Sequence, residues 1–246
     1  MLEFPSIKLD LFFAMPYVKT LYRSLPLSTP TTNYYDWLLG RPELNAWPDY
    51  TVHVDAVTGE RRRFRAVLER LEQAAAALAS CPNDGGLGFA AGQPGIVGIL
   101  SENCLVCSNF SSAIVALSPA IAACVKEFPI LALALLKIAV PMALLPSQST
   151  LHETTALLKL SNITFLFASE HMYPHAAAAA KEVGLPEDRI IILQGNVTGK
   201  VSLPRLIEEV KIRGLPRLPT QTVQDDTLAY LVFSSGTTGL PKGYFA

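Results

Sequence analysis

The chain has 246 residues, half of them hydrophobic, which is enough to bury the core of one large domain or two small ones. The 20 basic and 21 acidic residues leave a net charge of −1, which excludes a broad positive field of the kind that attracts nucleic acid. We therefore predict a globular protein without a nucleic-acid partner, in which any anion is bound locally.

Cysteine usage and the amino terminus indicate where the protein works. The four cysteines are too few for the disulfide framework of a small secreted domain, and Cys104 and Cys107 lack the second pair that a metal site of this spacing needs. The charged residues Glu3, Lys8 and Asp10 interrupt the first segment, which does not have the pattern of a signal peptide. We expect a cytoplasmic location, with a peroxisomal or membrane-associated one as the alternative.

The first regular elements are predicted from residue 50 onward. Residues 50–55 alternate as a strand, and a helix is predicted to begin within Arg61–Arg63, whose side chains are interpreted as a solvated face rather than a phosphate site. Apolar residues then recur at three- and four-residue steps, which places them on one buried face. The apolar run 95–100 predicts a strand covered on both faces.

The region that follows is unusually apolar. Residues 103–125 carry no charge, and only Lys137 interrupts the apolar stretch 128–146. The stretch from Asn103 to Ile138 is about twenty residues longer than one strand-to-helix step requires, so an aberrant insertion near residues 106–130, such as translated intron, is one hypothesis. A transmembrane helix within 108–145, either at 108–125 or at 128–145, is the other, although Pro119, Lys137 and Pro141 disfavour it.

Strands and helices alternate through the rest of the chain. Thr150 and Glu153 have the spacing of a capping box, and Gly184 and Gly214 are predicted helix stops. A metal site at His171 and His175 is less favoured than a turn, because Pro174 interrupts a helix between them. The predicted segments are a helix near 157–160, strands at 163–167, 190–193 and 227–233, and helices at 176–183 and 202–213. This order predicts an α/β fold with a mostly parallel sheet covered by helices.

A loop rich in glycine and hydroxyl residues follows the last predicted strand directly. Glycines let backbone N–H groups approach an anion, hydroxyls add neutral donors, and a lysine supplies positive charge. Pro241 before the lysine and Gly243 after it distinguish the loop from the common nucleotide-binding loop, and a flexible turn is the alternative. The predicted phosphate-binding residues are Ser234, Ser235, Gly236, Thr237, Thr238, Gly239 and Lys242. No catalytic residue and no metal ligand is predicted.

The run Tyr230–Gly243 resembles the signature loop of the adenylate-forming, AMP-binding superfamily, which includes acyl-CoA synthetases and 4-coumarate:CoA ligases. Weaker similarity to fungal acyl-CoA ligase-like proteins extends the resemblance over residues 45–105 and 138–243. It implies that Thr237, Thr238, Gly239 and Lys242 hold the β- and γ-phosphates of MgATP while a carboxylic acid substrate forms an acyl-adenylate. Coenzyme A would then accept the acyl group, a reaction of fatty acid metabolism.

The resemblance implies an incomplete enzyme. Residues 1–44 are interpreted as an amino-terminal extension, and residues 45–246 as the truncated first part of the large adenylation domain. The family continues after Gly243 with a strand and a Thr/Ser-His pair, whereas this chain reads Tyr244, Phe245 and Ala246. We therefore expect an acid–thiol ligase relative that is inactive by itself. The alternatives are a non-catalytic truncated relative and a small membrane protein.

Overall fold

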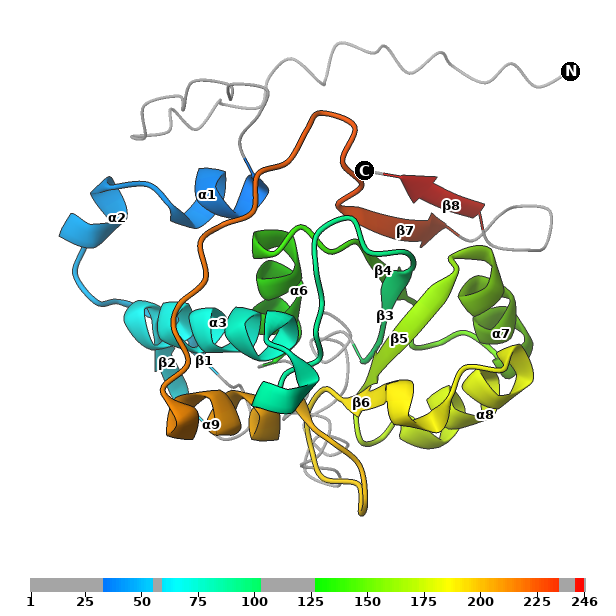
Figure 1. The fold of residues 1–246 in the computed structure, drawn as a ribbon. Helices are drawn as coiled ribbons and strands as arrows, with labels where there is room; N and C mark the ends of the chain where they lie inside the picture. Colours follow the sequence, from blue (N-terminus) through cyan, green and yellow to red (C-terminus); the bar gives the residue numbers. More distant parts are fainter. Residues whose placement is uncertain (1–32, 55–58, 103–126, 235–241, 246) are drawn as a thin grey trace, which may run out of the picture.

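The computed structural model describes residues 33–54, 59–102, 127–234 and 242–245, the last four and Ser234 by their backbone (Figure 1). The first part of this chain holds two short helices, a β-hairpin, a long helix and a 3₁₀ turn. They are α1 (Tyr34–Leu39), α2 (Glu43–Ala46), β1 (Thr51–Val54), β2 (Arg61–Arg63), α3 (Phe64–Ala79) and η2 (Pro82–Asp84).

A six-stranded sheet and its helices form the rest of the described structure. The strands lie in the order β6-β5-β3-β4-β7-β8. The first five strands in this order are parallel, and β8 joins the edge in antiparallel orientation. In chain order the elements are β3 (Ile96–Leu100), α6 (Phe128–Lys137), β4 (Met142–Leu145), α7 (Leu151–Leu160), β5 (Ile163–Ala168), α8 (Tyr173–Val183), η5 (Glu187–Arg189), β6 (Ile190–Ile192), α9 (Leu203–Arg213), β7 (Tyr230–Ser234) and β8 (Lys242–Phe245). The predicted α/β class with a mostly parallel sheet is confirmed.

Helices cover both faces of this sheet. The connections β3 to β4 and β6 to β7 run one way along the sheet, whereas β4 to β5 and β5 to β6 run the other way, which places their helices on opposite faces. Accordingly α6 and α9 share one hydrophobic cluster with α3, and α7 and α8 share another. Adjacent residues of β4 show the division, because Met142 belongs to the first cluster and Ala143 to the second.

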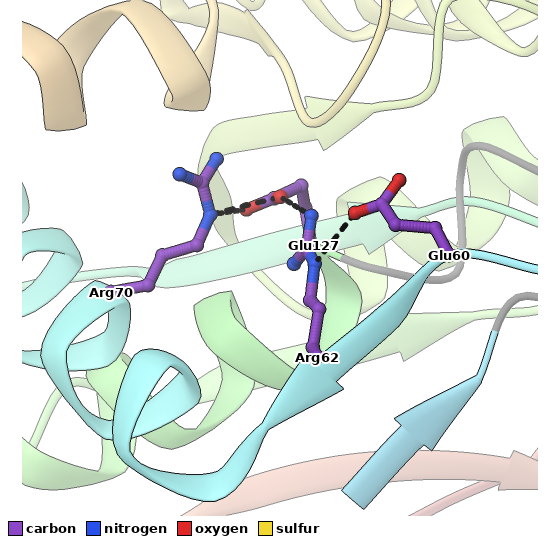
Figure 2. Close-up of polar contacts among 4 residues, drawn as sticks. All are labelled: Glu60, Arg62, Arg70 and Glu127. Atoms are coloured by element: carbon purple, nitrogen blue, oxygen red, sulfur yellow. Dashed lines mark hydrogen bonds and ion pairs between the residues drawn. The ribbon is translucent and has the colours of Figure 1, made fainter. Parts of the chain in front are cut away.

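The prediction that a helix begins within Arg61–Arg63 is wrong. These residues form β2, which pairs antiparallel with β1, and α3 begins at Phe64. The pairing turns Arg62 inward, where its Nη2 donates to Oε1 of Glu127 at 3.1 Å. Arg70 of α3 donates from Nε to both oxygens of the same carboxylate, at 3.0 and 2.9 Å. Figure 2 shows the carboxylate of Glu127 between the two guanidinium groups.

Local signals located most of the later elements correctly. Thr150 and Glu153 form both hydrogen bonds of a capping box at the start of α7. Gly184 and Gly214 end α8 and α9 in left-handed conformations that a side chain would strain. Helix α8 begins at Tyr173, earlier than residue 176, because Pro174 occupies its first turn and needs no intrahelical N–H partner there.

Most of the hypothetical insertion at 106–130 lies outside the described residues, as does the first transmembrane candidate, 108–125. Residues 127–130 are described: Glu127 is 2% exposed and Ile130 is 1% exposed, and both contribute to the folded unit. In the second candidate, 128–145, α6 ends at Lys137 and β4 follows. Among the helices of the described ranges, none is long and apolar enough to cross a membrane.

Candidate functional site

The parallel strands bring their carboxyl ends together at one edge of the sheet. β3 and β4 are neighbours there, and the chain leaves them toward helices on opposite faces, α6 and α7. Ligands of open α/β sheets bind outside the carboxyl ends of strands near such a change of direction. β7 lies beside β4 and is parallel to it, so the loop that follows β7 begins at these carboxyl ends.

The predicted phosphate loop connects the two strands of a hairpin. β7 ends at Ser234 and β8 begins at Lys242, and these two residues are paired across the ladder. Ser235, Gly236, Thr237, Thr238 and Gly239 lie outside the described residues. The hairpin therefore brings the first and last predicted residues opposite each other at the backbone. Residues 242–245 form a strand, although Tyr244 and Phe245 depart from the residues that the resemblance led us to expect.

The strand before the loop is paired on both sides, with β4 and with β8. β7 pairs with β4 from Tyr230 to Val232, and Leu231 is 3% exposed because it packs into the cluster of α7 and α8. Tyr230 and Val232, which point to the opposite face, are each 37% exposed. β7 is thus held between its ladders with β4 and β8 and by one apolar face, and the predicted loop follows its carboxyl end. The strand begins at Tyr230 rather than at the predicted Thr227, since residues 227–229 make no ladder pairing.

A polar pair at the ends of β3 and β5 was missed by the sequence analysis. Ser169 donates from Oγ to Oε2 of Glu102 at 2.7 Å and accepts the N–H of Met172 at 3.2 Å. His171 Nε2 lies 3.9 Å from Oε1 of Glu102. A usable signal existed, because Ser169 directly follows the buried strand β5 and Glu102 lies two residues after the buried strand β3. A carboxylate repels phosphate, so this pair orders the ends of β3 and β5 rather than holding the anion.

The histidines that the sequence singled out do not come together at a metal site. His171 precedes α8, whereas His175 lies within it and has Nε2 at 2.8 Å from Oγ1 of Thr154. Within the described ranges no group of three or more His, Cys, Asp or Glu residues could hold a metal ion. Residues 170–172 form the predicted turn after β5, whereas residues 173–175 already belong to α8.

Comparison with known proteins decides the family. The family model described as AMP-binding enzyme matches residues 41–245, which is most of the chain and includes the whole phosphate loop. The chain belongs to the AMP-binding enzyme family. The predicted membership of the adenylate-forming superfamily is therefore confirmed, and α1 lies before the first residue that the family model matches.

The curated relatives of this family member are much longer than the chain. It is 34% identical over 118 residues to the 4-hydroxybenzoate--CoA/benzoate--CoA ligase of Rhodopseudomonas palustris, a match that covers 48% of this chain and 21% of that ligase. It is 27% identical over 116 residues to peroxisomal OPC-8:0-CoA ligase 1 of Arabidopsis thaliana, covering 47% of this chain and 20% of the ligase. The matches thus span about a fifth of each relative.

Solved structures show the same fold. A red-emitting luciferase from Phrixothrix hirtus superposes with a TM-score of 0.63 at 20% identity, over 89% of this chain and 36% of the luciferase. The anthranilate CoA ligase AuaEII, in complex with anthranoyl-AMP, gives 0.63 at 19% identity over 89% and 35%. ATP-bound MatB from Rhodopseudomonas palustris gives 0.57 at 18% identity over 87% and 34%. The chain therefore has the fold of about a third of an adenylate-forming enzyme.

Proposed function

We propose that residues 234–242 bind the triphosphate of MgATP, and that this is the contribution of the chain to an acyl-CoA synthetase reaction. The observation that carries the proposal is the placement of a loop rich in glycine, serine and threonine at the carboxyl end of parallel strand β7, with Lys242 opposite Ser234. The family match over residues 41–245 supports it.

Each predicted residue has a physical task in this proposal. Gly236 and Gly239 allow backbone N–H groups to approach the phosphate oxygens, and Thr237 and Thr238 add hydroxyl donors. Ser234 and Ser235 provide donors at the end of β7. Lys242 neutralises charge on the β- and γ-phosphates. Mg²⁺ enters with the nucleotide, since it is usually held through substrate phosphates and water.

The reaction needs such a loop because its two reactants repel each other. A carboxylate oxygen attacks the α-phosphorus of ATP, the bond between the α-phosphorus and the bridging oxygen breaks, and pyrophosphate leaves with the electron pair. Donors at the β- and γ-phosphates lower the charge that the carboxylate approaches and stabilise the leaving pyrophosphate. In the second step a coenzyme A thiolate attacks the acyl carbonyl and AMP leaves.

The names of the relatives guide the finer parts of the proposal. Both curated relatives are named as CoA ligases, and of the structural neighbours MatB is bound to ATP and AuaEII to an acyl-adenylate, anthranoyl-AMP. We therefore propose a carboxylic acid and coenzyme A as the remaining substrates. We propose the cytoplasm as the location, with the peroxisome as the alternative because one relative is named as peroxisomal.

A second candidate is a nucleotide-binding relative without ligase activity. The matches cover only 20% and 21% of the curated relatives, so most of each relative lies outside the aligned segment. This candidate shares the phosphate site with the first, and it differs only in that it does not catalyse the ligase reaction.

Calorimetric titration of residues 1–246 with MgATP tests the shared part. Lys242→Ala should weaken binding about 10- to 100-fold, because a hydrogen bond to a charged group contributes about 1.5–3 kcal/mol. Lys211→Ala is the matched control, since Lys211 is exposed on α9. Equal affinity of the Lys242 variant and the wild type would reject the site. Acid-dependent pyrophosphate release would then separate a ligase from a binding protein.

A further inference from the structure

We propose that Asn33 is a positioning residue for the phosphate loop. It clamps the connector, residues 215–229, which runs from the end of α9 to the start of β7 (Figure 1). The link to the loop rests on the proposed function, whereas the clamp is a property of the fold that can be measured without nucleotide.

Between its ends the connector is hydrogen-bonded to the rest of the molecule at one point, and Leu218 and Leu228 also pack against the two hydrophobic clusters. Within the described residues, three hydrogen bonds join positions 216–228 to other elements, and all three involve Thr220 or Gln221. Asn33 Nδ2 donates to the carbonyl of Gln221 at 3.0 Å, and the Gln221 N–H donates to the carbonyl of Lys137 at 2.9 Å. Thr220 Oγ1 donates to Oδ1 of Asp36 at 2.6 Å. The connector is therefore fixed to α1 and to the end of α6.

Asn33 is the residue that joins these parts. It is 5% exposed, and its Nδ2 also donates to the carbonyl of Leu136 at 2.9 Å. Its Oδ1 accepts the N–H of Tyr35 at 2.8 Å and caps α1. A side-chain amide offers two donor hydrogens and one acceptor, so no other small side chain can satisfy all three partners at once.

Helix α1, which Asn33 caps, is held in place by a buried polar cluster. Lys137 Nζ lies 2.6 and 2.7 Å from the two oxygens of Glu72, and the Tyr35 hydroxyl donates to Oε1 of Glu72 at 2.7 Å. The ammonium group lies 4.6 Å from the centre of the Tyr35 ring. Burial, followed by the hydrogen bond to Glu72, raises the pKa of Tyr35 above its ordinary value. Helix α1 is thus anchored to α3 and α6, and Asn33 carries that anchorage to the connector.

The connector has less support beyond the clamp. Its residues Val223–Asp225 and Thr227–Ala229 border a cavity of about 370 Å³ together with Asn33, Tyr34 and Leu136. The carbonyl of Ala229 then accepts the N–H of Met142, where the ladder between β4 and β7 begins. Because the cavity borders this half of the connector, the clamp adds to the β4 and β8 ladders in limiting how far β7, and with it Ser234, can shift.

The placement of α1 puts the clamp outside the segment that the family model matches. Asn33 and α1 precede residue 41, where the family match begins. We infer that residues outside the matched segment help to set the position of the loop inside it.

Amide hydrogen exchange of Asn33→Asp, without nucleotide, is the test. Aspartate keeps an oxygen for the cap at Tyr35 but cannot donate to the carbonyls of Leu136 and Gln221. We expect exchange at least about tenfold faster in residues 221–234, which corresponds to a loss of about 1.4 kcal/mol in local opening free energy. Thr220→Val, which removes only the hydroxyl bonded to Asp36, should give a smaller effect in the same segment.

Asn45→Asp, at an exposed position of α2, is the control for the added charge. Unchanged exchange in residues 221–234 would overturn the clamp, as would equal acceleration in α7 and α8, which would show a general loss of stability. MgATP titration of the same variants tests the link to the loop, which predicts weaker binding for Asn33→Asp. Unaltered affinity beside faster exchange would overturn that link, whereas absence of binding in the wild type would reject the proposed function alone.

Discussion

At the scale of single residues, the buried carboxylate of Glu127 gives a prediction for stability. It is 2% exposed and is held by Arg62 of β2 and Arg70 of α3. Glu127→Gln would remove the buried negative charge that both guanidinium groups share, although Arg62 also pairs with Glu60 at 3.6 Å. We expect the free energy of unfolding in urea to fall by about 3 kcal/mol.

Glu209→Gln provides the comparison for this prediction. Glu209 pairs with Arg205 one helical turn away on the surface of α9, and such exposed pairs contribute about 0.3–0.5 kcal/mol. If both substitutions cost the same small amount, the buried cluster at Glu127 would not contribute to stability as described.

Glu153 gives a prediction for the dependence of stability on pH. Hydrogen bonds from the backbone and the hydroxyl of Thr150 lower the pKa of Glu153 below its ordinary value of 4.5. Because the folded pKa lies below the unfolded one, the stabilisation is complete above the unfolded pKa and is lost as pH falls through the folded pKa. Glu153→Gln should therefore lower the melting temperature at about pH 7 but not at about pH 2.

Melting curves of Glu208→Gln, an exposed residue of α9, serve as the reference for the loss of one surface charge. A melting difference for Glu153→Gln that persists at acid pH, where the carboxyl is protonated, would contradict the assigned cause of the pKa shift.

The two glutamates also show which residue contacts a sequence reveals. Thr150 and Glu153 are three residues apart, so the spacing alone identified their capping box. Glu127 is separated from Arg70 by 57 residues and from Arg62 by 65, and only the packing of α3 and β2 against α6 brings them together. The pair Glu102 and Ser169, 67 residues apart, was missed for the same reason.

At the scale of elements, the apolar region between β3 and α6 yields a deletion test. We propose that residues 106–126 form the insertion, because Glu127 and Ile130 contribute to the folded unit. A variant lacking residues 106–126 should keep a cooperative unfolding transition. A variant lacking residues 106–130 should lose stability, since it removes the partner of both arginines and the buried Ile130.

Thermal and urea unfolding of the two deletion variants, compared with the full chain, distinguish the possibilities. Loss of cooperative unfolding in the shorter deletion would show that residues 106–126 are needed for the fold. Equal stability of the two variants would contradict the assignment of residues 127–130 to the core.

Element prediction succeeded where periodicity and local stop signals agreed. The end of α9 at Gly214 and the apolar strands β3 and β5 are examples. It failed at Arg61–Arg63 because a strand whose side chains are polar is recognisable only through its pairing with β1. The start of β7 was placed too early, because the apolar run continues upstream of the point where the ladder with β4 begins.

At the scale of the whole molecule, the sheet order could not be predicted, although the alternation of strands and helices was. Strand order depends on contacts between distant segments, such as β3 beside both β4 and β5. The candidate site was predictable from the sequence as a loop, since its residues are contiguous. The strands that neighbour the loop at the carboxyl ends of the sheet, and the clamp at Asn33, could be identified only from the fold.

The central claim is that residues 234–242 bind the β- and γ-phosphates of a nucleotide. The most direct measurement is competition, in which pyrophosphate and AMP are titrated separately against bound MgATP in the wild type, with Lys242→Ala as the binding-deficient comparison. If residues 234–242 bind these two phosphates, pyrophosphate should displace ATP, whereas AMP, which lacks both phosphates, should displace it far less. If AMP displaced ATP as effectively as pyrophosphate does, this assignment of the loop would be contradicted. Binding would then depend on the nucleoside monophosphate rather than on the β- and γ-phosphates.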